Sequence, residues 1–286
     1  MKPFPKAVSV VMRSFNEAWA IGETIRSLTM QEFDGEIELI VIDSGSTDGS
    51  VEIIRQANPA KFIEIPLGTY VPGVVLNQGA REGSHDWIVY LNADATPVDG
   101  SWLRNLLEPC LEAENFGAGF SRQIARPDCR AVFAHDYDRC FGPRRVSKDW
   151  DHFFSMVSSI THRSVLEKHP IREDLQYAED DEWTRRLCEN GLSIVFAEKS
   201  VVTHSHNYTL RQSFRRAAGD ARAMAAAGTL PARSVGWPAT FMGCATDSLR
   251  DAGWCLANGK PAELPFAAAT RIAQRLGRRK GAGASC

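Results

Sequence analysis

Oxygen-bearing side chains gather at the end of an apolar run, where they could bind a metal ion. In the segment "WIVYLNADATP", Asn92 and Asp94 follow the run and place two oxygen ligands on one side of an extended chain. Mg²⁺ and Mn²⁺ are commonly held by one or two carboxylates, with phosphate oxygens and water completing the coordination shell. The alternative is an ordinary strand end with polar side chains, and these two residues alone leave both interpretations open.

A second cluster could supply a general base. In "AEDDEWTRRL", the acidic residues 179–182 begin a predicted helix. The helix dipole favours negative charge at this end, and that structural explanation covers most of the cluster. Crowding of like charges raises carboxylate pKa values while the dipole lowers them, so one member could act as a base near neutral pH.

Two further polar motifs each have a functional and a structural interpretation. "THSHNY" places His204 and His206 on one side of a predicted strand, where either could join Asp94 at a metal ion. In "DSGSTDGS", Asp43 could accept hydrogen bonds from a ribose or a base edge, and the small residues let the backbone approach a ligand. The structural alternatives are surface or core histidines and a capped turn between a strand and a helix.

Alternating strands and helices must position these motifs. Short β-branched runs joined by helical patterns indicate an α/β fold with a parallel sheet covered on both faces. We expect strands at 7–12, 37–43, 61–65 and 87–91, and helices at 18–28, 50–57 and 74–82. Because open α/β sheets bind ligands outside the carboxyl ends of their strands, Asp43 and Asp94 lie where a site is expected.

The second half of the chain has a different pattern. We expect helices at 101–113 and 180–190, strands at 117–123, 193–197 and 200–206, and a helical region from 209 onward. Basic residues cluster in this last region, at Arg211, Arg215, Arg216, Arg222, Arg271, Arg275, Arg278, Arg279 and Lys280. They could meet anionic lipid head groups, or they could form a solvated helix face.

Composition narrows the classes of function. The 286 residues are 44% hydrophobic and 24% charged, with a net charge of -2, so no global basic field favours a nucleic-acid partner. Seven dispersed cysteines without a CxxC or metal spacing indicate reduced thiols and a cytoplasmic location. No apolar run reaches the ~18 residues that span a bilayer. A dinucleotide-binding oxidoreductase is disfavoured because no GxGxxG follows the first strand.

Together, four motifs resemble those of the family 2 glycosyltransferases with a GT-A fold, over roughly residues 8–208. They are "VSVVMRSFNEAWAIGETIRSL", "ELIVIDSGSTDGSVEII", "VYLNADATP" and "YAEDDEWTRRLCENGLSIVFAEKSVVTHSHNY". The "EDxEW" and "HSHNY" forms are most similar to those of bacterial rhamnosyltransferases.

The resemblance implies a Rossmann-like, mostly parallel central sheet flanked by helices. We expect a GT-A domain over 1–208, with a nucleotide-binding half at 1–98 and an acceptor half at 99–208. A helical C-terminal extension over 209–280 and a disordered tail at 281–286 complete the expected organisation.

The resemblance also implies roles for individual residues. Asp180 would be the catalytic base, and Glu179 would shape its environment. Asp94 would hold the metal with His204 as a second ligand, while a neutral Asn92 at the first position of the DxD motif puts metal affinity in question. The residues expected at the donor are Arg13, Phe15, Glu17, Asp43, Ser44, Asn77, Arg81, Asn92 and Ala93, with Arg81 at the diphosphate.

The implied activity is inverting transfer of a sugar, with rhamnose favoured, from a dTDP-, UDP- or GDP-sugar. It would require Mg²⁺ or Mn²⁺ and would serve surface-polysaccharide synthesis. The acceptor would be a glycan or a lipid-linked glycan, which places the protein in the cytoplasm with peripheral contact at the inner face of the cell membrane. The alternatives are transfer of another hexose and a catalytically silent nucleotide-sugar binding protein, for which Asn92 is the only support.

Overall fold

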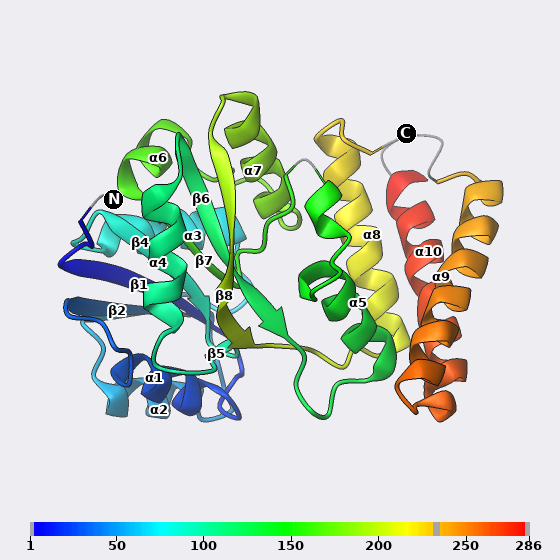
Figure 1. Ribbon diagram of the computed structural model, residues 1–286, viewed down its shortest axis with the longest axis horizontal. Coiled ribbons are helices and arrows are strands. Elements are labelled where there is room, and N and C mark those ends of the chain that lie inside the picture. Colours follow the sequence, from blue (N-terminus) through cyan, green and yellow to red (C-terminus); the bar gives the residue numbers. More distant parts are fainter. Residues whose placement is uncertain (1–2, 151, 231–234, 284–286) are drawn as a thin grey trace. The chain divides into compact units, whose positions relative to one another are not determined.

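The computed structural model describes residues 3–150, 152–230 and 235–283, and the chain divides into two compact units (Figure 1). The first unit comprises the described residues up to Ile124 together with Val146–Leu175 and Glu179–His204. The second comprises Ala125–Arg145, Gln176–Ala178 and the described residues from Ser205 onward. This division differs from the predicted boundary at residue 208, because residues 125–145 cluster with the C-terminal helices.

A mixed sheet forms the centre of the first unit, in the order β3-β2-β1-β4-β7-β6-β8-β5. The strands are β1 (Ala7–Ser14), β2 (Glu36–Asp43), β3 (Lys61–Glu64), β4 (Trp87–Asn92), β5 (Thr96–Pro97), β6 (Phe116–Ile124), β7 (Ser158–His162) and β8 (Ser193–Thr203). The strands β3, β2, β1 and β4 run parallel, as predicted. β7 is antiparallel to both β4 and β6, and the sequence pattern did not reveal it.

β8 corrects the prediction of two short strands. It is one strand parallel to β6, and its register shifts between the pairs Ser121–Ala197 and Arg122–Val201. This irregularity interrupts the apolar pattern within the strand, and the interruption made one strand look like two in the sequence. The strand ends at Thr203, so both predicted histidines follow it.

Helices cover both faces of the sheet. Those of the first unit are α1 (Ile21–Thr29), α2 (Ser50–Ala57), α3 (Pro72–Glu82), α4 (Trp102–Glu112), α6 (Arg163–Lys168), α7 (Glu179–Glu189) and the short η1 (Ser147–Asp149). One continuous core joins apolar residues of β1 and β4 to α1, α2 and α4. On the other face, α3 packs closely against Val11 of β1. Burial on both faces explains the unbroken apolar runs of the strands.

The loops that follow β1 and β2 are joined by hydrogen bonds. Asn16 Oδ1 accepts from the Thr47 backbone N–H at 2.9 Å, and Asp48 Oδ2 accepts from the Ala18 backbone N–H at 2.9 Å. Asn16 adopts a left-handed backbone with φ of 56°. The two polar loops therefore form one wall at the carboxyl ends of the strands.

The second unit is helical. It contains α5 (Ala131–Phe141), α8 (Leu210–Ala226), α9 (Trp237–Ala257), the short η3 (Pro261–Glu263) and α10 (Leu264–Gly283). α8 begins with a capping box formed by Thr209 and Gln212. Residues 281–283 of the predicted disordered tail belong to α10, and residues 284–286 lie outside the described residues. α5 was not predicted.

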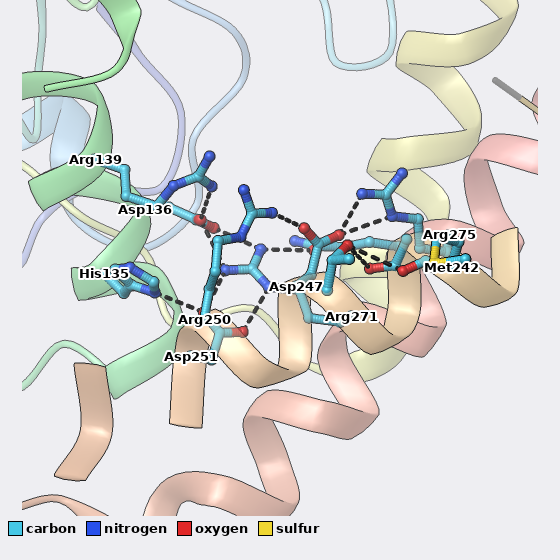
Figure 2. Close-up of polar contacts among 12 residues, drawn as sticks. His135, Asp136, Arg139, Met242, Asp247, Arg250, Asp251, Arg271 and Arg275 are labelled. Atoms are coloured by element: carbon cyan, nitrogen blue, oxygen red, sulfur yellow. Dashed lines mark hydrogen bonds and ion pairs between the residues drawn. The ribbon is translucent and has the colours of Figure 1, made fainter. Parts of the chain in front are cut away.

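Part of the predicted lipid-facing basic cluster lies inside this unit. Arg271 is 6% exposed and donates to Asp251 at 2.7 Å and to Asp136 at 2.8 Å (Figure 2). Arg275 is ion-paired with Asp247. Arg271 is therefore buried, which neither expected alternative allows, and the charge of Arg275 is already engaged within the unit.

None of the helices in the described part of the chain combines the length and apolar character needed to cross a membrane.

The close approach of α8 and α10 gives a stability prediction. A Cβ at Gly277 would stand 2.2 Å from the Phe214 carbonyl oxygen, whereas a Cβ at Gly253 on α9 would meet no atom within 4 Å. Both positions are helical, so alanine adds helix propensity at each. Gly277→Ala should nevertheless destabilise the protein by about 1–3 kcal/mol, because the helices must separate.

Gly253→Ala is the matched control and should stabilise the protein by about 0.5–1 kcal/mol. Urea unfolding followed by circular dichroism would measure both variants. Equal stabilisation by the two alanines would mean that α8 and α10 do not pack at this distance.

Candidate functional site

A cavity of about 380 Å³ opens at the carboxyl ends of β1, β2 and β4 in the first unit. It is lined by Arg13, Ser14, Phe15, Glu17, Ser44, Leu67, Gly68, Tyr70 and Asn92. The ring of Phe15 is 47% exposed, so an aromatic surface is available to a ligand. The cavity therefore combines an apolar surface with hydrogen-bonding groups, as small-molecule sites do.

Arg13 forms the inner wall of this cavity. Its guanidinium donates to Asn92 Oδ1 at 2.8 Å and to the Tyr70 hydroxyl at 2.9 Å, and it lies 3.9 Å from Glu179 Oε1. Burial lowers the pKa of Arg13, but Tyr70 and Glu179 oppose this effect and the net pKa is raised above its ordinary value. Arg13 therefore remains a cation that connects the segment after β4 with the start of α7.

Asp94 and His204 form a buried pair near the ends of β4 and β8. Asp94 Oδ2 lies 3.5 Å from His204 Nε2, and the two residues are 0% and 5% exposed. His204 Nδ1 lies 2.9 Å from Gln123 Oε1, while Gln123 Nε2 donates to Ser155 Oγ at 2.7 Å. With Gln123 in this orientation, Nδ1 carries the proton and the lone pair of Nε2 faces Asp94.

These residues fit a divalent cation. A carboxylate and an unprotonated imidazole nitrogen face each other, and a cation between them would satisfy both. Burial, followed by the negative charge of Asp94, raises the pKa of Glu17 to about 8. Glu17 Oε2 is buried without a hydrogen-bond partner among the described residues. A cation beside Asp94 would relieve this crowding of buried carboxyl groups.

His206 is the second histidine of the "THSHNY" motif. It belongs to the second unit, where its ring centroid stands 5.2 Å from that of Tyr208. The sequence left the choice between the two histidines open. Of the two, His204 shares a unit with Asp94 and has an acceptor that orients its ring.

The acidic run at the start of α7 contains carboxylates in different environments. Glu179 lies 3.9 Å from Arg13, Asp181 lies 3.1 Å from His152, and Glu182 lies 3.1 Å from Arg186. Burial raises the pKa of Asp180, although its carboxylate accepts a hydrogen bond from the Asp181 backbone N–H at 2.9 Å. A carboxylate with a raised pKa that interacts with Arg13, a residue of the cavity lining, is a candidate general base.

Five of the predicted donor residues lie together at the cavity, namely Arg13, Phe15, Glu17, Ser44 and Asn92. Asp43 does not line it. Its carboxylate instead accepts from the backbone N–H groups of Gly45 and Ser46 at 3.0 and 2.7 Å. Ala93 is fully buried, and its N–H donates to the Arg13 carbonyl at 3.0 Å. Asp43 and Ala93 therefore shape the loops that form the cavity.

Asn77 and Arg81 are on α3 and are also outside the set of lining residues. The Asn77 side chain donates to the Ile171 carbonyl at 2.8 Å and accepts from the Ile171 N–H at 3.2 Å. Arg81 is exposed and lies 3.9 Å from Glu173. Asn77 thus joins α3 to a later segment, and contact of either residue with a donor stays a prediction.

Sequence reasoning missed four lining residues, namely Ser14, Leu67, Gly68 and Tyr70. Three of them lie in "PLGTYVP", between β3 and α3. Gly68 has a φ of 84°, a backbone conformation that favours glycine. A glycine-containing turn after a strand of a predicted parallel sheet is the sequence signal that could have identified these lining residues.

Comparisons with known proteins agree with this architecture. A family model described as Glycosyl transferase family 2 matches residues 9–169. An O-antigen chain rhamnosyltransferase, RfbN, from Salmonella typhimurium is 26% identical over 194 residues, which are 63% of this chain and 60% of the relative. The chain therefore spans about 60% of the length of this curated relative.

Two solved structures show the same fold. The mannosyltransferase PcManGT from Pyrobaculum calidifontis, in complex with GDP-Man and Mn²⁺, has a TM-score of 0.62 and 21% identity, covering 94% of this chain and 74% of its own. Glucosyl-3-phosphoglycerate synthase from Mycobacterium tuberculosis, with Mn²⁺, UDP and glucosyl-3-phosphoglycerate, has a TM-score of 0.55 and 20% identity, covering 79% and 82%. The predicted GT-A fold is confirmed.

Proposed function

This chain belongs to glycosyl transferase family 2, and from this premise we propose that it is an inverting, metal-dependent glycosyltransferase with a nucleotide-sugar donor. The observation that carries the proposal is the position of Arg13 in the cavity. Its guanidinium contacts Asn92, two residues before Asp94, and lies 3.9 Å from Glu179, the neighbour of Asp180. One cation thereby connects the candidate metal pair with the candidate base.

The cavity suits the nucleotide part of the donor. The exposed ring of Phe15 offers a stacking surface to a base, and Ser44 offers a hydroxyl. The rhamnosyltransferase relative supports rhamnose as the transferred sugar. The solved structures contain GDP-mannose or UDP, so dTDP-, UDP- and GDP-sugars are all donors to be tested.

Asp94 and His204 would hold the Mg²⁺ or Mn²⁺ ion. When bound, the cation supplies positive charge that neutralises the departing nucleoside diphosphate. Gln123 keeps the proton of His204 on Nδ1 and so leaves Nε2 able to bind metal. Arg13 remains charged and adds a fixed positive potential at the wall of the cavity.

Asp180 would accept the proton of the acceptor hydroxyl as that oxygen attacks the anomeric carbon. Attack from the face opposite the leaving diphosphate inverts the anomeric configuration. Burial raises the pKa of Asp180, which makes its carboxylate a better proton acceptor than an exposed aspartate.

Metal binding gives the next prediction. Asp94→Asn and His204→Ala should each weaken Mn²⁺ binding at least tenfold, because each removes one ligand. Gln123→Leu should weaken Mn²⁺ binding by about 10–100-fold, because the imidazole of His204 would lose the hydrogen bond that orients it. Electron paramagnetic resonance of free Mn²⁺, titrated with the protein and a nucleoside diphosphate, would measure all three. Asp99→Asn, in an exposed turn, is the control.

Unchanged Mn²⁺ affinity in His204→Ala would contradict the metal site. Hydrolysis of the donor by the wild type with added Mn²⁺ would exclude the alternative of a catalytically silent binding protein.

The proposed base gives a prediction for activity. Asp180→Asn should lower kcat by about 10²–10⁴-fold while nucleotide binding is retained, because a general base contributes this factor. Only the unprotonated base is active, so kcat/KM of the wild type should rise with pH. The midpoint of this rise should lie above the ordinary aspartate pKa of 3.8, because burial raises the pKa of Asp180.

Transfer assays with wild type, Asp180→Asn and the control Glu189→Gln would measure both effects. Glu189 ends the same helix and pairs with Arg185 on its exposed side. Near-wild-type transfer by Asp180→Asn would show that another group is the base.

A lipid-linked acceptor would bring the enzyme to a membrane surface, and we propose that the second unit provides this contact. α9 presents Phe241, Met242, Leu249 and Leu256, which are 68%, 67%, 73% and 64% exposed. Arg211, Arg215 and Lys280 are exposed on α8 and α10 of the same unit. Apolar residues accompanied by exposed cations complement an anionic lipid surface.

Replacing two of these apolar residues should remove the contact. The double variant Phe241→Glu, Leu249→Glu should lower co-sedimentation with phosphatidylglycerol-containing vesicles more than tenfold. Met30→Glu, at a 62% exposed position of the first unit, is the control. Vesicle binding that is independent of anionic lipid content, or unchanged in the double variant, would contradict the proposal.

A further inference from the structure

The second unit contains a cavity of about 440 Å³ that the proposed transfer does not use. Residues of α5, α8, α9 and α10 line it, together with His206 and Tyr208 from the segment before α8. Its lining includes three arginines and three aspartates beside aromatic rings. Such a mixed lining is unusual for a gap between packed helices, which apolar side chains normally fill.

Two of the three aspartates that line the cavity, Asp136 and Asp247, are each shared between two cations. Asp247 is ion-paired with both Arg250 and Arg275, and Asp136 with Arg271 and Arg139, the latter at 3.8 Å (Figure 2). One negative charge cannot neutralise two guanidinium groups. Among the described residues, neither of these two aspartates pairs with Arg216 or Arg278, the other two arginines of the lining.

Arg278 lines the cavity one helical turn after Arg275 on α10. Its guanidinium has no hydrogen bond or ion pair with any residue that the structure describes. Burial, followed by the charge of Arg275, lowers the pKa of Arg278, and the negative charge of Asp220 opposes this effect only in part. A half-buried guanidinium next to a second cation is a group that an anion would stabilise.

A second arginine completes the anion-binding chemistry. The guanidinium carbon of Arg216 stands 4.7 Å from the centroid of the Tyr208 ring, so a cation and an aromatic surface adjoin each other. Tyr137 and Phe133 contribute further rings, and Gln274 contributes an amide. Aromatic faces suit the C–H faces of a sugar ring, while amide and carboxylate groups suit its hydroxyls.

We propose that this cavity binds a saccharide carrying a phosphate or carboxylate group. The oxyanion accepts hydrogen bonds from Arg278 and Arg216, and the sugar ring packs against Tyr208. The saccharide belongs to the class of charged glycans that the proposed transfer, on which this assignment rests, would use as acceptors. Binding of the saccharide itself does not require the transfer reaction.

Titration calorimetry of the full chain would test this proposal with four probes, namely glucose 6-phosphate, glucuronate, glucose and inorganic phosphate. At least one charged saccharide should bind at least tenfold more tightly than both glucose and inorganic phosphate. The comparison of the two charged saccharides decides between phosphate and carboxylate. Charged saccharides that bind no more tightly than glucose would overturn the proposal.

Substitutions locate the binding within the second unit. Arg278→Met should weaken binding of the charged saccharide at least tenfold, and Arg278→Lys should weaken it less. Tyr208→Leu should weaken binding of the saccharide but not of inorganic phosphate. Arg222→Met, at an exposed position of α8 outside the cavity lining, should bind as the wild type does. Equal binding by wild type and Arg278→Met would overturn the proposal.

Nucleotide binding separates this inference from the proposed function. Every variant should bind UDP, GDP or dTDP with Mn²⁺ as the wild type does, which also confirms that the variants fold. Displacement of the charged saccharide by a nucleotide would place it in the first unit and overturn the inference. A wild type that binds the charged saccharide but no nucleotide would contradict the proposed function alone.

Discussion

The guanidinium of Arg13 is a partly buried cation at the carboxyl end of β1, and three otherwise separate segments meet at it. It contacts Asn92 after β4, Tyr70 before α3 and Glu179 at the start of α7. Removing one partner of a buried charge is costly, about 3–5 kcal/mol, because the other partner remains buried and unpaired. The geometry of the candidate site therefore depends on this residue more than on any single loop.

The same arrangement gives a physical role to Asn92. A carboxylate at this position would add negative charge near Asp94, where burial, followed by the charge of Asp94, already raises the pKa of Glu17 to about 8. The neutral amide still accepts a hydrogen bond from Arg13 at 2.8 Å without adding charge. The departure from the DxD pattern thus has a structural explanation, and it no longer favours a catalytically silent protein.

The second unit also contains a cluster of charged side chains, in which arginines have different environments. Arg271 is satisfied by two aspartates, whereas Arg278 has a lowered pKa that burial and the charge of Arg275 explain. The helical pattern of α10 places Arg271, Arg275 and Arg278 on nearby parts of one helix surface. Their different environments arise from α5 and α9, whose aspartates reach two of these arginines.

The sequence by itself determined the local elements of the first hundred residues and the family motifs at their ends. β-branched runs and helical periodicity act over a few residues, so β1, β2, α2 and β4 were predicted closely. Only the tertiary structure decided that β7 pairs antiparallel, that Asn77 joins α3 to Ile171, and that Arg271 is buried. It also decided which carboxylates have raised pKa values. These properties depend on burial and on partners as many as 139 residues away along the chain, and no local pattern records them.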